Sequence, residues 1–424
     1  MEIINSIKLL ILIYSLFPIY YSLKWIFKGQ INAAIICYPI FFFFYPLHLI
    51  FDITLGFPEF PKKFLNLEVA MKNSYSNYIY FLILVSIITI FLISQRRPRF
   101  NISLNFKQKY NTKKKFTVNI LIIISILLLS YFLITPTPSI YLIYGKIRSS
   151  PDLITADGYS KVAFYSLASA VIIIICRLID GAYCSTKKRI LYLSLILIAI
   201  YLNNKRLIFV FIPIYYLVEL FIYNNRKKLF NFFISIILFV IAYYLYAENM
   251  KFSDKVMDTK LLYFYLRHEL SRDDILLFSI YYRIIENKEI LEYPGQSFVA
   301  TILNYFPREL YLDKPYPYGQ YLTNSLMYGK LGHGLLGWTV TTSIYDEFIS
   351  NFSYYGLFII PIFTFIYLKK IDSIKNIKKK LFFIFLYFLL LIFHTSPYAI
   401  LIYYAIWLII FRPLLVAISQ GVKN

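Results

Sequence analysis

The chain has 424 residues, of which 59% are hydrophobic and only 16% are charged. A soluble protein would not carry so many apolar segments long enough to cross the roughly 30 Å hydrocarbon core of a membrane, so we exclude a soluble fold. The net charge of +22 at pH 7 would suit a nucleic-acid-binding protein, but the basic residues gather in short loops between apolar segments. We therefore expect a membrane protein with no nucleic-acid partner.

The apolar segments are continuous and lack the period-two alternation of a β-barrel, which favours helical spans. We predict an all-α polytopic membrane protein with about eleven transmembrane helices, the first of them retained because MEIINSIKLL lacks the features of a cleaved signal. Loops on one side are rich in Lys and Arg and contain only two acids, Asp180 and Asp372, which places that side in the cytoplasm. The predicted spans are residues 4–23, 31–51, 76–94, 116–134, 159–179, 190–203, 206–223, 229–247, 352–368, 381–394 and 398–415.

These spans divide the chain into three segments. The first eight spans occupy residues 1–246, a large polar insert occupies 247–351, and the last three spans occupy 352–424. The insert faces outside, and it holds most of the acidic residues together with His268 and His333. If the protein performs chemistry, most of the reacting groups have to come from this insert.

Two of the predicted helical hairpins are short. Residues 189–224 and 380–412 each contain fewer than the roughly 40 residues that two full spans require. Recessed turns would bring polar groups to membrane depth, which is tolerated where they line a cavity or pack in protein. We therefore expect Lys205, Arg206 and His394 in an outward-facing cavity. The alternative is tilted or thinned packing in which Lys205 and Arg206 extend to the surface.

Inside the insert, the pattern from Ser271 to Asp274 precedes an apolar run and matches a capping box, which predicts a helix reaching about Lys288. Regular helical spacing would place Arg272 and Arg283 on one face of that helix. A second short helix is predicted over 296–305, and the Pro and Gly content of 311–320 predicts a loop.

Basic residues of the outer segments are candidates for phosphate binding, because arginine grips phosphate with two N–H groups and lysine acts as a point charge. Converging cations above a membrane cavity suit a lipid diphosphate. The alternative is an ordinary ion pair with a neighbouring acid, as between Arg272 and Asp273. The candidates are Arg206 in its turn, Arg272 with Arg283 on the first helix, and Arg308 with Lys314 beside a proline-flanked loop.

Three residues of the insert are candidates for a general base: Asp346, Glu347 and His333. A buried carboxylate gains the raised pKa that this role needs, although an acid at this place can also be a simple membrane-entry charge and a loop histidine can be merely solvated. The match of residues 332–337 to G-x-G-x-x-G has no preceding strand, so we reject a dinucleotide site. Metal-ligand spacings are absent from the sequence, and we expect no metal or cofactor.

Several of these segments together resemble a known family. The charged turn at Arg206, the Arg272–Asp273 pair, FPREL (306–310) leading into DKP (313–315), and YDEF (345–348) followed by NFSYYG (351–356) resemble the Wzy-type O-antigen polymerases. These enzymes are the oligosaccharide repeat-unit polymerases of bacterial surface polysaccharide pathways. The resemblance covers about residues 200–370, and the family usually has Gly where this chain has Ser353.

The resemblance implies a GT-C-like helical glycosyltransferase of the bacterial cytoplasmic (inner) membrane, with its large loop in the periplasm. It would polymerise undecaprenyl-diphosphate-linked oligosaccharides, with a chain-length regulator as a further candidate partner. Glycosyl transfer needs cations against the leaving diphosphate and a base for the acceptor hydroxyl. The catalytic candidates are Glu347, His333, Arg272 and Arg308, and the substrate-binding candidates are Arg206, Lys205, Arg283, Lys314, Asp273 and His394.

Two other functions fit a membrane protein of this layout. One is an O-antigen ligase that transfers the glycan to the lipid A core, and the other is a non-enzymatic polysaccharide flippase or transporter. Against transport, the charges concentrate in one outer insert, whereas a transport pathway needs ionisable groups within the spans. Glu219 is the main ionisable residue predicted inside a span, close to the basic residues 226–228.

Overall fold

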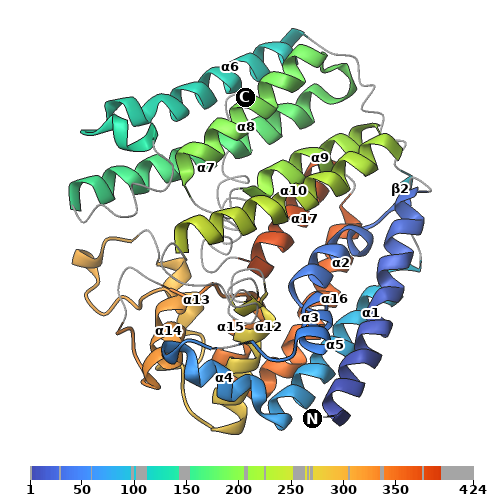
Figure 1. Ribbon diagram of the computed structural model, residues 1–424, viewed down its shortest axis with the longest axis vertical. Coiled ribbons are helices and arrows are strands. Elements are labelled where there is room, and N and C mark those ends of the chain that lie inside the picture. The colour runs from blue at the N-terminus through green and yellow to red at the C-terminus, as the bar shows by residue number, and fades with distance from the viewer. Residues whose placement is uncertain are drawn as a thin grey trace, which may run out of the picture. The chain divides into compact units, whose positions relative to one another are not determined.

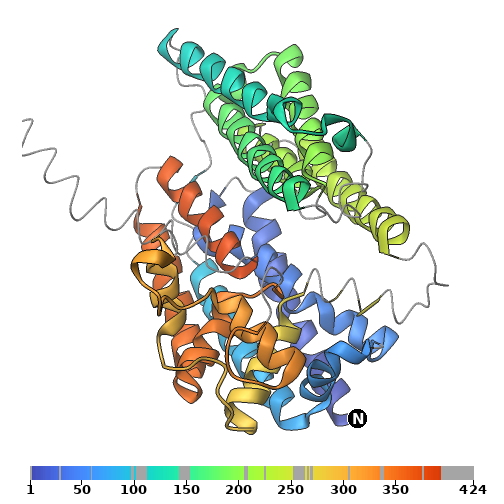
Figure 2. The same cartoon turned by 90° about the vertical axis from the view of Figure 1, so that its left-hand side faces the viewer.

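The computed structural model confirms the predicted all-helical class (Figures 1 and 2). Two strands of two residues each, β1 (Gln30–Ile31) and β2 (Phe100–Asn101), pair in the one small sheet of the described chain. The structure describes residues 2–27, 30–58, 60–96, 100–101, 112–142, 153–204, 209–223, 226–251, 263–264, 267, 271–303, 306–334, 339–374 and 377–392.

The chain divides into two compact units. Unit 1 comprises Met1–Phe100 and Asp258–Asn424, and unit 2 comprises Asn101–Met257. Most of the large insert therefore belongs to the same unit as the first and the last predicted spans. The predicted division into 1–246, 247–351 and 352–424 follows the membrane layout and stays a prediction.

Unit 1 is built from long apolar helices and from the short helices of the insert. Its α-helices are α1 (Glu2–Phe27), α2 (Ala33–Phe44), α3 (Leu47–Leu55), α4 (Leu65–Lys72), α5 (Ser74–Gln95), α12 (Asp273–Ile280), α13 (Gln296–Ile302), α14 (Tyr318–Tyr328), α15 (Ile344–Phe352), α16 (Tyr354–Ser373) and α17 (Ile377–Ile392). Single turns add 3₁₀ segments at Lys62–Phe64 and Arg308–Leu310 and a π-helix at Tyr281–Ile285.

Unit 2 is a helical bundle whose core lies between α6, α7, α8 and α9. Glu219 in α9 is buried there and accepts hydrogen bonds from Arg177 and from Lys228, the latter at 2.7 Å. The predicted proximity of Glu219 to the basic residues 226–228 is thus confirmed. The helices of unit 2 are α6 (Thr112–Ser130), α7 (Leu153–Asp180), α8 (Thr186–Asn203), α9 (Phe211–Tyr223) and α10 (Arg226–Lys251), with 3₁₀ turns at Tyr131–Ile134, Pro138–Leu142 and Gly181–Tyr183.

Six helical segments of the described chain are long and apolar enough to cross a membrane. Outward side chains on them are strongly exposed, for example Leu10 at 66%, Leu82 at 69% and Phe116 at 69%, as expected for contact with lipid. Four further predicted spans coincide with α8, α9, α10 and α17, and the last, 398–415, lies outside the described residues. The six segments are Ile3–Ile26, Ala33–Leu55, Ser74–Gln95, Phe116–Ile134, Lys161–Tyr183 and Tyr354–Ser373.

The second predicted span, 31–51, corresponds to the candidate span Ala33–Leu55, which consists of two helices with a break between them. Helix α2 ends at Phe44 and α3 begins at Leu47, because Pro46 has no N–H to continue the ladder. The carbonyl of Phe44 accepts instead from the backbone N–H of Arg272 at 3.0 Å. The break therefore exposes backbone at the place where the insert packs against the span, and the insert satisfies it.

The predicted helix over 271–288 is shorter and less regular than expected. Helix α12 begins at Asp273, and Ser271 does not cap it. The helix continues as a π-helix that contains Arg283, so the spacing that would align Arg272 with Arg283 is lost. Helix α13 confirms the second short helix, although it ends at Ile302, and the predicted loop 311–320 runs into α14 from Tyr318.

A tight corner joins the insert to α16. Ser353 has φ 50°, a left-handed conformation that favours glycine. The Ser353 hydroxyl donates to the carbonyl of Arg283 at 3.3 Å, and Tyr354 donates to the carbonyl of Ile284 at 3.0 Å. These bonds tie the π-helix to the start of α16.

Replacing Gly356 by alanine should destabilise this corner. An added Cβ would lie 2.7 Å from the carbonyl oxygen of Phe348 and 2.9 Å from the backbone nitrogen of Ile349, and backbone atoms cannot turn aside. We expect the free energy of unfolding to fall by about 1–3 kcal/mol. Gly158→Ala in α7 is the matched control, because its Cβ would make an ordinary 3.5 Å contact. Thermal unfolding of the purified protein in detergent compares the two, and equal melting temperatures would contradict the steric argument.

Candidate functional site

The sequence-predicted site residues fall in separate places. Lys205, Arg206 and His394 lie outside the described residues. In unit 1 the remaining seven form one group on the insert surface and three buried or half-buried positions along α12 and α15. The surface group is Arg308, Lys314 and His333, and the other positions are Arg272 with Asp273, Arg283, and Glu347.

Arg308 and His333 pack on the same tyrosine. The guanidinium carbon of Arg308 lies 3.9 Å from the ring centroid of Tyr316, and the His333 ring stacks on Tyr316 with centroids 3.9 Å apart. Two groups cannot both stand this close over one ring face, so they cover its two faces. We call Arg308, Tyr316 and His333 the aromatic stack. Lys314 belongs to the same loop, since its carbonyl accepts from Arg308 Nη1 at 2.6 Å.

Two glycines hold His333 in the stack. Gly332 has φ 111°, which a larger residue rarely adopts, and a Cβ on Gly334 would come within 2.5 Å of Asn324 Oδ1. The Asn324 amide in turn donates to the carbonyl of Lys330 at 3.0 Å. The glycines that produced the G-x-G-x-x-G match at Gly332 and Gly334 therefore shape a turn. His333 is positioned by that turn, in contrast to the solvated loop residue that was the simpler reading of the sequence.

A chain of hydrogen bonds extends the stack toward an acid. Tyr321 packs edge-on against His333, and its hydroxyl accepts from Gln296 Nε2 at 3.0 Å. Gln296 also donates to Glu292 Oε2 at 2.9 Å. Arg308, a half-buried cation, and the exposed carboxylate of Glu292 are thus linked through α13, the 306–317 loop and α14.

Helix α15 carries the predicted acids and is fixed at both ends. Ser343 and Asp346 form a capping box at its start. Near its end Asn351 accepts from Gly295 N at 2.8 Å and donates to Ser297 Oγ at 2.8 Å, which joins α15 to α13. Glu347, between these two points, is buried. The sequence contains the S-x-x-D pattern of this box at Ser343, the signal that would have located it.

Asp346 is a buried carboxyl with an unusual electrostatic setting. Its Oδ1 accepts from Ser343, and its Oδ2 has no hydrogen bond within the described part of the chain. The nearby Tyr318 hydroxyl lowers the pKa of Asp346, but this hydroxyl is hydrogen-bonded to Ser350. Burial raises the pKa of Asp346 to about 7, with the hydrogen bonds from Ser343 acting in the opposite direction.

Asp346→Asn should remove a pH dependence of stability. The pKa of Asp346 is 3.8 in the unfolded chain and about 7 in the folded chain, so between these pH values the folded state keeps a proton that the unfolded state has lost. The contribution of Asp346 to the free energy of unfolding therefore falls as pH rises through this window and stays low above it. Asparagine keeps an oxygen for Ser343 without titrating.

Melting temperatures of the purified protein at pH 5 and pH 8 test this. Relative to wild type, the Asp346→Asn protein should gain stability at the higher pH. The exposed Asp313→Asn serves as the charge control. A variant that loses as much stability as wild type between the two pH values would show that Asp346 does not titrate there.

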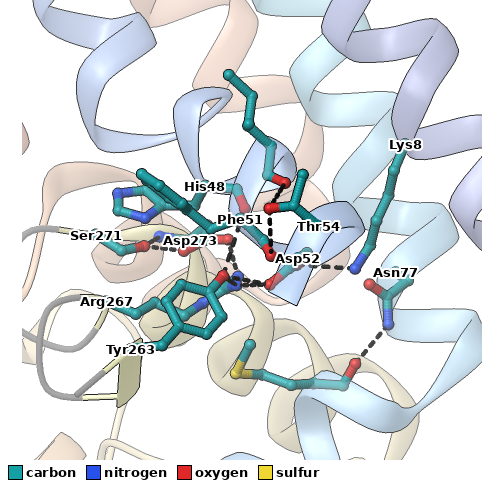
Figure 3. A network of polar contacts seen from close by, with 12 residues as sticks. Lys8, His48, Phe51, Asp52, Thr54, Asn77, Tyr263, Arg267, Ser271 and Asp273 are labelled. Atoms are coloured by element: carbon teal, nitrogen blue, oxygen red, sulfur yellow. Dashed lines mark hydrogen bonds and ion pairs between the residues drawn. The ribbon is translucent and has the colours of Figure 1, made fainter. Parts of the chain in front are cut away.

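A second polar group is fully enclosed where α1, α3 and α12 meet (Figure 3). Lys8 donates to Asp52 Oδ2 at 2.8 Å, and Arg267 pairs with both Asp52 and Asp273. We call Lys8, Asp52, Arg267 and Asp273 the buried charge network. Tyr263 adds a hydrogen bond to Asp52 Oδ1 at 2.6 Å. Two cations and two anions alternate, so the network is neutral and holds distant segments together.

The buried charge network contains Asp273, which the sequence suggested as an ion-pair partner of Arg272 and which the structure pairs with Arg267. Both oxygens of Asp273 are used, one by Arg267 and one by the Ser271 hydroxyl. Burial alone would lower the pKa of Arg267, but Asp273 and Asp52 raise it well above its ordinary value. Arg272 is buried beside the break of the second span, with its guanidinium 5.8 Å from the centre of the Phe44 ring. Asp273 thus positions Arg267, and Arg272 faces the broken helix.

The sequence interpretation missed most of the network. Lys8 lies inside the predicted span 4–23, where an ionisable residue is a signal of structural or functional importance, and Asp52 directly follows the predicted span 31–51. Arg267 carried no comparable pattern. Arg283, by contrast, was singled out, and its Nη1 donates only weakly to the carbonyl of Lys288 at 3.3 Å.

Comparisons with protein-family models, with curated proteins and with solved structures find no match to this chain.

Proposed function

We propose that this protein is a membrane glycosyltransferase that polymerises undecaprenyl-diphosphate-linked oligosaccharide repeat units at the outer face of the bacterial cytoplasmic membrane. The observation that carries the proposal is the aromatic stack. It joins Arg308, which lies in a segment that resembles O-antigen polymerases, with His333, a candidate base, on one half-exposed surface of the insert. The insert packs in the same unit as four candidate membrane spans. A lipid-linked glycan needs this combination of a polar surface and an adjacent membrane.

The reaction joins two lipid-linked glycans. A hydroxyl of the acceptor sugar attacks the anomeric carbon of the donor, the bond from that carbon to the diphosphate oxygen breaks, and the hydroxyl proton passes to a base. Negative charge develops on the leaving diphosphate, which cations stabilise. Arg308 is our first candidate for this role, and Arg272 is the second. Arg206, Lys205, Arg283, Lys314 and His394 are proposed to bind the substrate.

His333 is better placed to act as the base than the buried carboxyls of Asp346 and Glu347. Its imidazole is half-exposed at the stack, whereas Glu347 is 2% exposed inside α15. A base must come within hydrogen-bond reach of the hydroxyl that it deprotonates. Because the acceptor arrives from outside the insert, His333 meets it without rearrangement of α15. We expect no metal or organic cofactor in this reaction.

Purified protein incubated with undecaprenyl-diphosphate repeat units alone tests the proposal. Successively longer lipid-linked glycans are the expected product. Transfer that requires added lipid A core would replace the polymerase with a ligase. Movement of the lipid-linked glycan across liposome membranes without any elongated product would overturn the enzymatic function.

A further inference from the structure

Beside the aromatic stack lies a surface with the chemistry that sugars require. Tyr293 and Tyr311 expose 43% and 42% of their surface, and the exposed carboxylate of Glu292 lies next to Tyr293 in the chain. Aromatic rings present an apolar face with a polar tip. An ionised carboxylate accepts hydrogen bonds and donates none, so it suits hydroxyl groups.

Hydrogen bonds hold this surface against the stack. Gln296 bridges Glu292 and Tyr321, and the backbone N–H of Glu292 donates to Gln296 Oε1 at 2.8 Å. On the other side, the N–H of Tyr311 donates to the carbonyl of Arg308 at 3.1 Å. Gln296 is 1% exposed, so a buried amide fixes the exposed carboxylate.

The electrostatics of Tyr321 support the same arrangement. Burial raises the pKa of Tyr321, the hydrogen bond from Tyr316 lowers it, and Glu292 and Tyr293 raise it further. Tyr293 and Tyr311 also interact, since the neighbouring Tyr311 adds to the effect of burial in raising the pKa of Tyr293. The contacts carry the same conclusion: Tyr311 is hydrogen-bonded to Arg308, and Glu292 is joined through Gln296 to Tyr321, so both exposed segments meet at the aromatic stack.

We propose that Glu292, Tyr293 and Tyr311 form a saccharide-binding surface for uncharged pyranose rings. The tyrosines contact the apolar face of a ring, and Glu292 accepts hydrogen bonds from its hydroxyls. A carboxylate at this point repels phosphate, so the surface takes the glycan while Arg308 takes the diphosphate. This assignment rests on the proposed function, because it identifies the bound saccharide as part of the lipid-linked substrate.

The test uses full-length protein in detergent and a printed array of bacterial surface oligosaccharides that lack lipid and diphosphate. Wild type should bind a subset of them. Glu292→Gln should weaken that binding about tenfold, the effect of losing one hydrogen bond to a charged group. Tyr311→Ala should also weaken it, because it removes the ring that contacts the apolar face of the sugar. Tyr328→Ala, an exposed tyrosine on α14 at 58%, is the matched control and should bind as wild type does.

The altered side chains are exposed, so unchanged melting temperatures are expected. Absence of saccharide binding by wild type, or equal binding by wild type and both variants, would overturn the surface. A protein that binds saccharides through Glu292 but never elongates the lipid-linked glycan would keep the surface and refute the polymerase. If wild type, Glu292→Gln and Tyr311→Ala all elongate the lipid-linked glycan with the same KM, only the saccharide-binding surface would be refuted.

Discussion

Arg267→Met is expected to lower the free energy of unfolding by about 3–5 kcal/mol, a large fraction of the stability of a typical protein. Arg267 is 2% exposed and pairs with two carboxylates, Asp52 and Asp273. Removing it leaves two buried anions with only Lys8 opposite them. The cost comes from that uncompensated charge, since methionine fills much of the same volume.

Charge balance provides the control for this prediction. Arg267→Met combined with Asp273→Asn leaves Lys8 and Asp52 as a neutral pair, and we expect it to recover much of the lost stability. Lys288→Ala removes an exposed ion pair with Glu286 and should cost less than about 1 kcal/mol. Denaturant titrations of the purified protein in detergent measure all three. The network would have no structural role if Arg267→Met cost no more than Lys288→Ala.

Local pattern and hydropathy were enough to predict the helical class, the positions of ten helical segments and the short helix α13. They could not predict the break between α2 and α3, because Pro39 also lies in α2 and does not end it. The break persists at Pro46 because a distant residue, Arg272, satisfies the carbonyl of Phe44. No property of residues 31–51 alone contains that information.

The same limit explains the site. Arg308 and His333 were selected by residue type, but their meeting on Tyr316 depends on how two loops fold. Arg272 and Arg283 were paired by regular helical spacing, which the π-helix removes. Sequence reasoning therefore found groups able to carry the chemistry more reliably than it found which of them act together.

The aromatic stack leads to the largest expected effect on activity. Arg308→Ala should slow elongation of lipid-linked glycans about a hundredfold, the usual loss when one preorganised donor to a developing anion is removed. The elongation rate of Arg308→Lys should lie between those of wild type and Arg308→Ala, because lysine keeps the charge but not the planar fork that stacks on Tyr316. Arg206→Ala should also slow elongation, and it extends the test to the turn outside the described residues.

Lys330→Ala is the matched control for Arg308→Ala. It removes an exposed cation of the same insert and leaves the backbone carbonyl of residue 330 in place, which accepts hydrogen bonds from Asn324 and Ser325. Single-turnover elongation rates of purified variants with equal melting temperatures separate catalysis from folding. If Arg308→Ala and Lys330→Ala elongate equally fast, Arg308 does not stabilise the leaving diphosphate. A rate lost in Arg308→Ala and partly restored in Arg308→Lys, at unchanged stability, supports a cation at this position in the transition state, because lysine restores the positive charge without the planar group that packs on Tyr316.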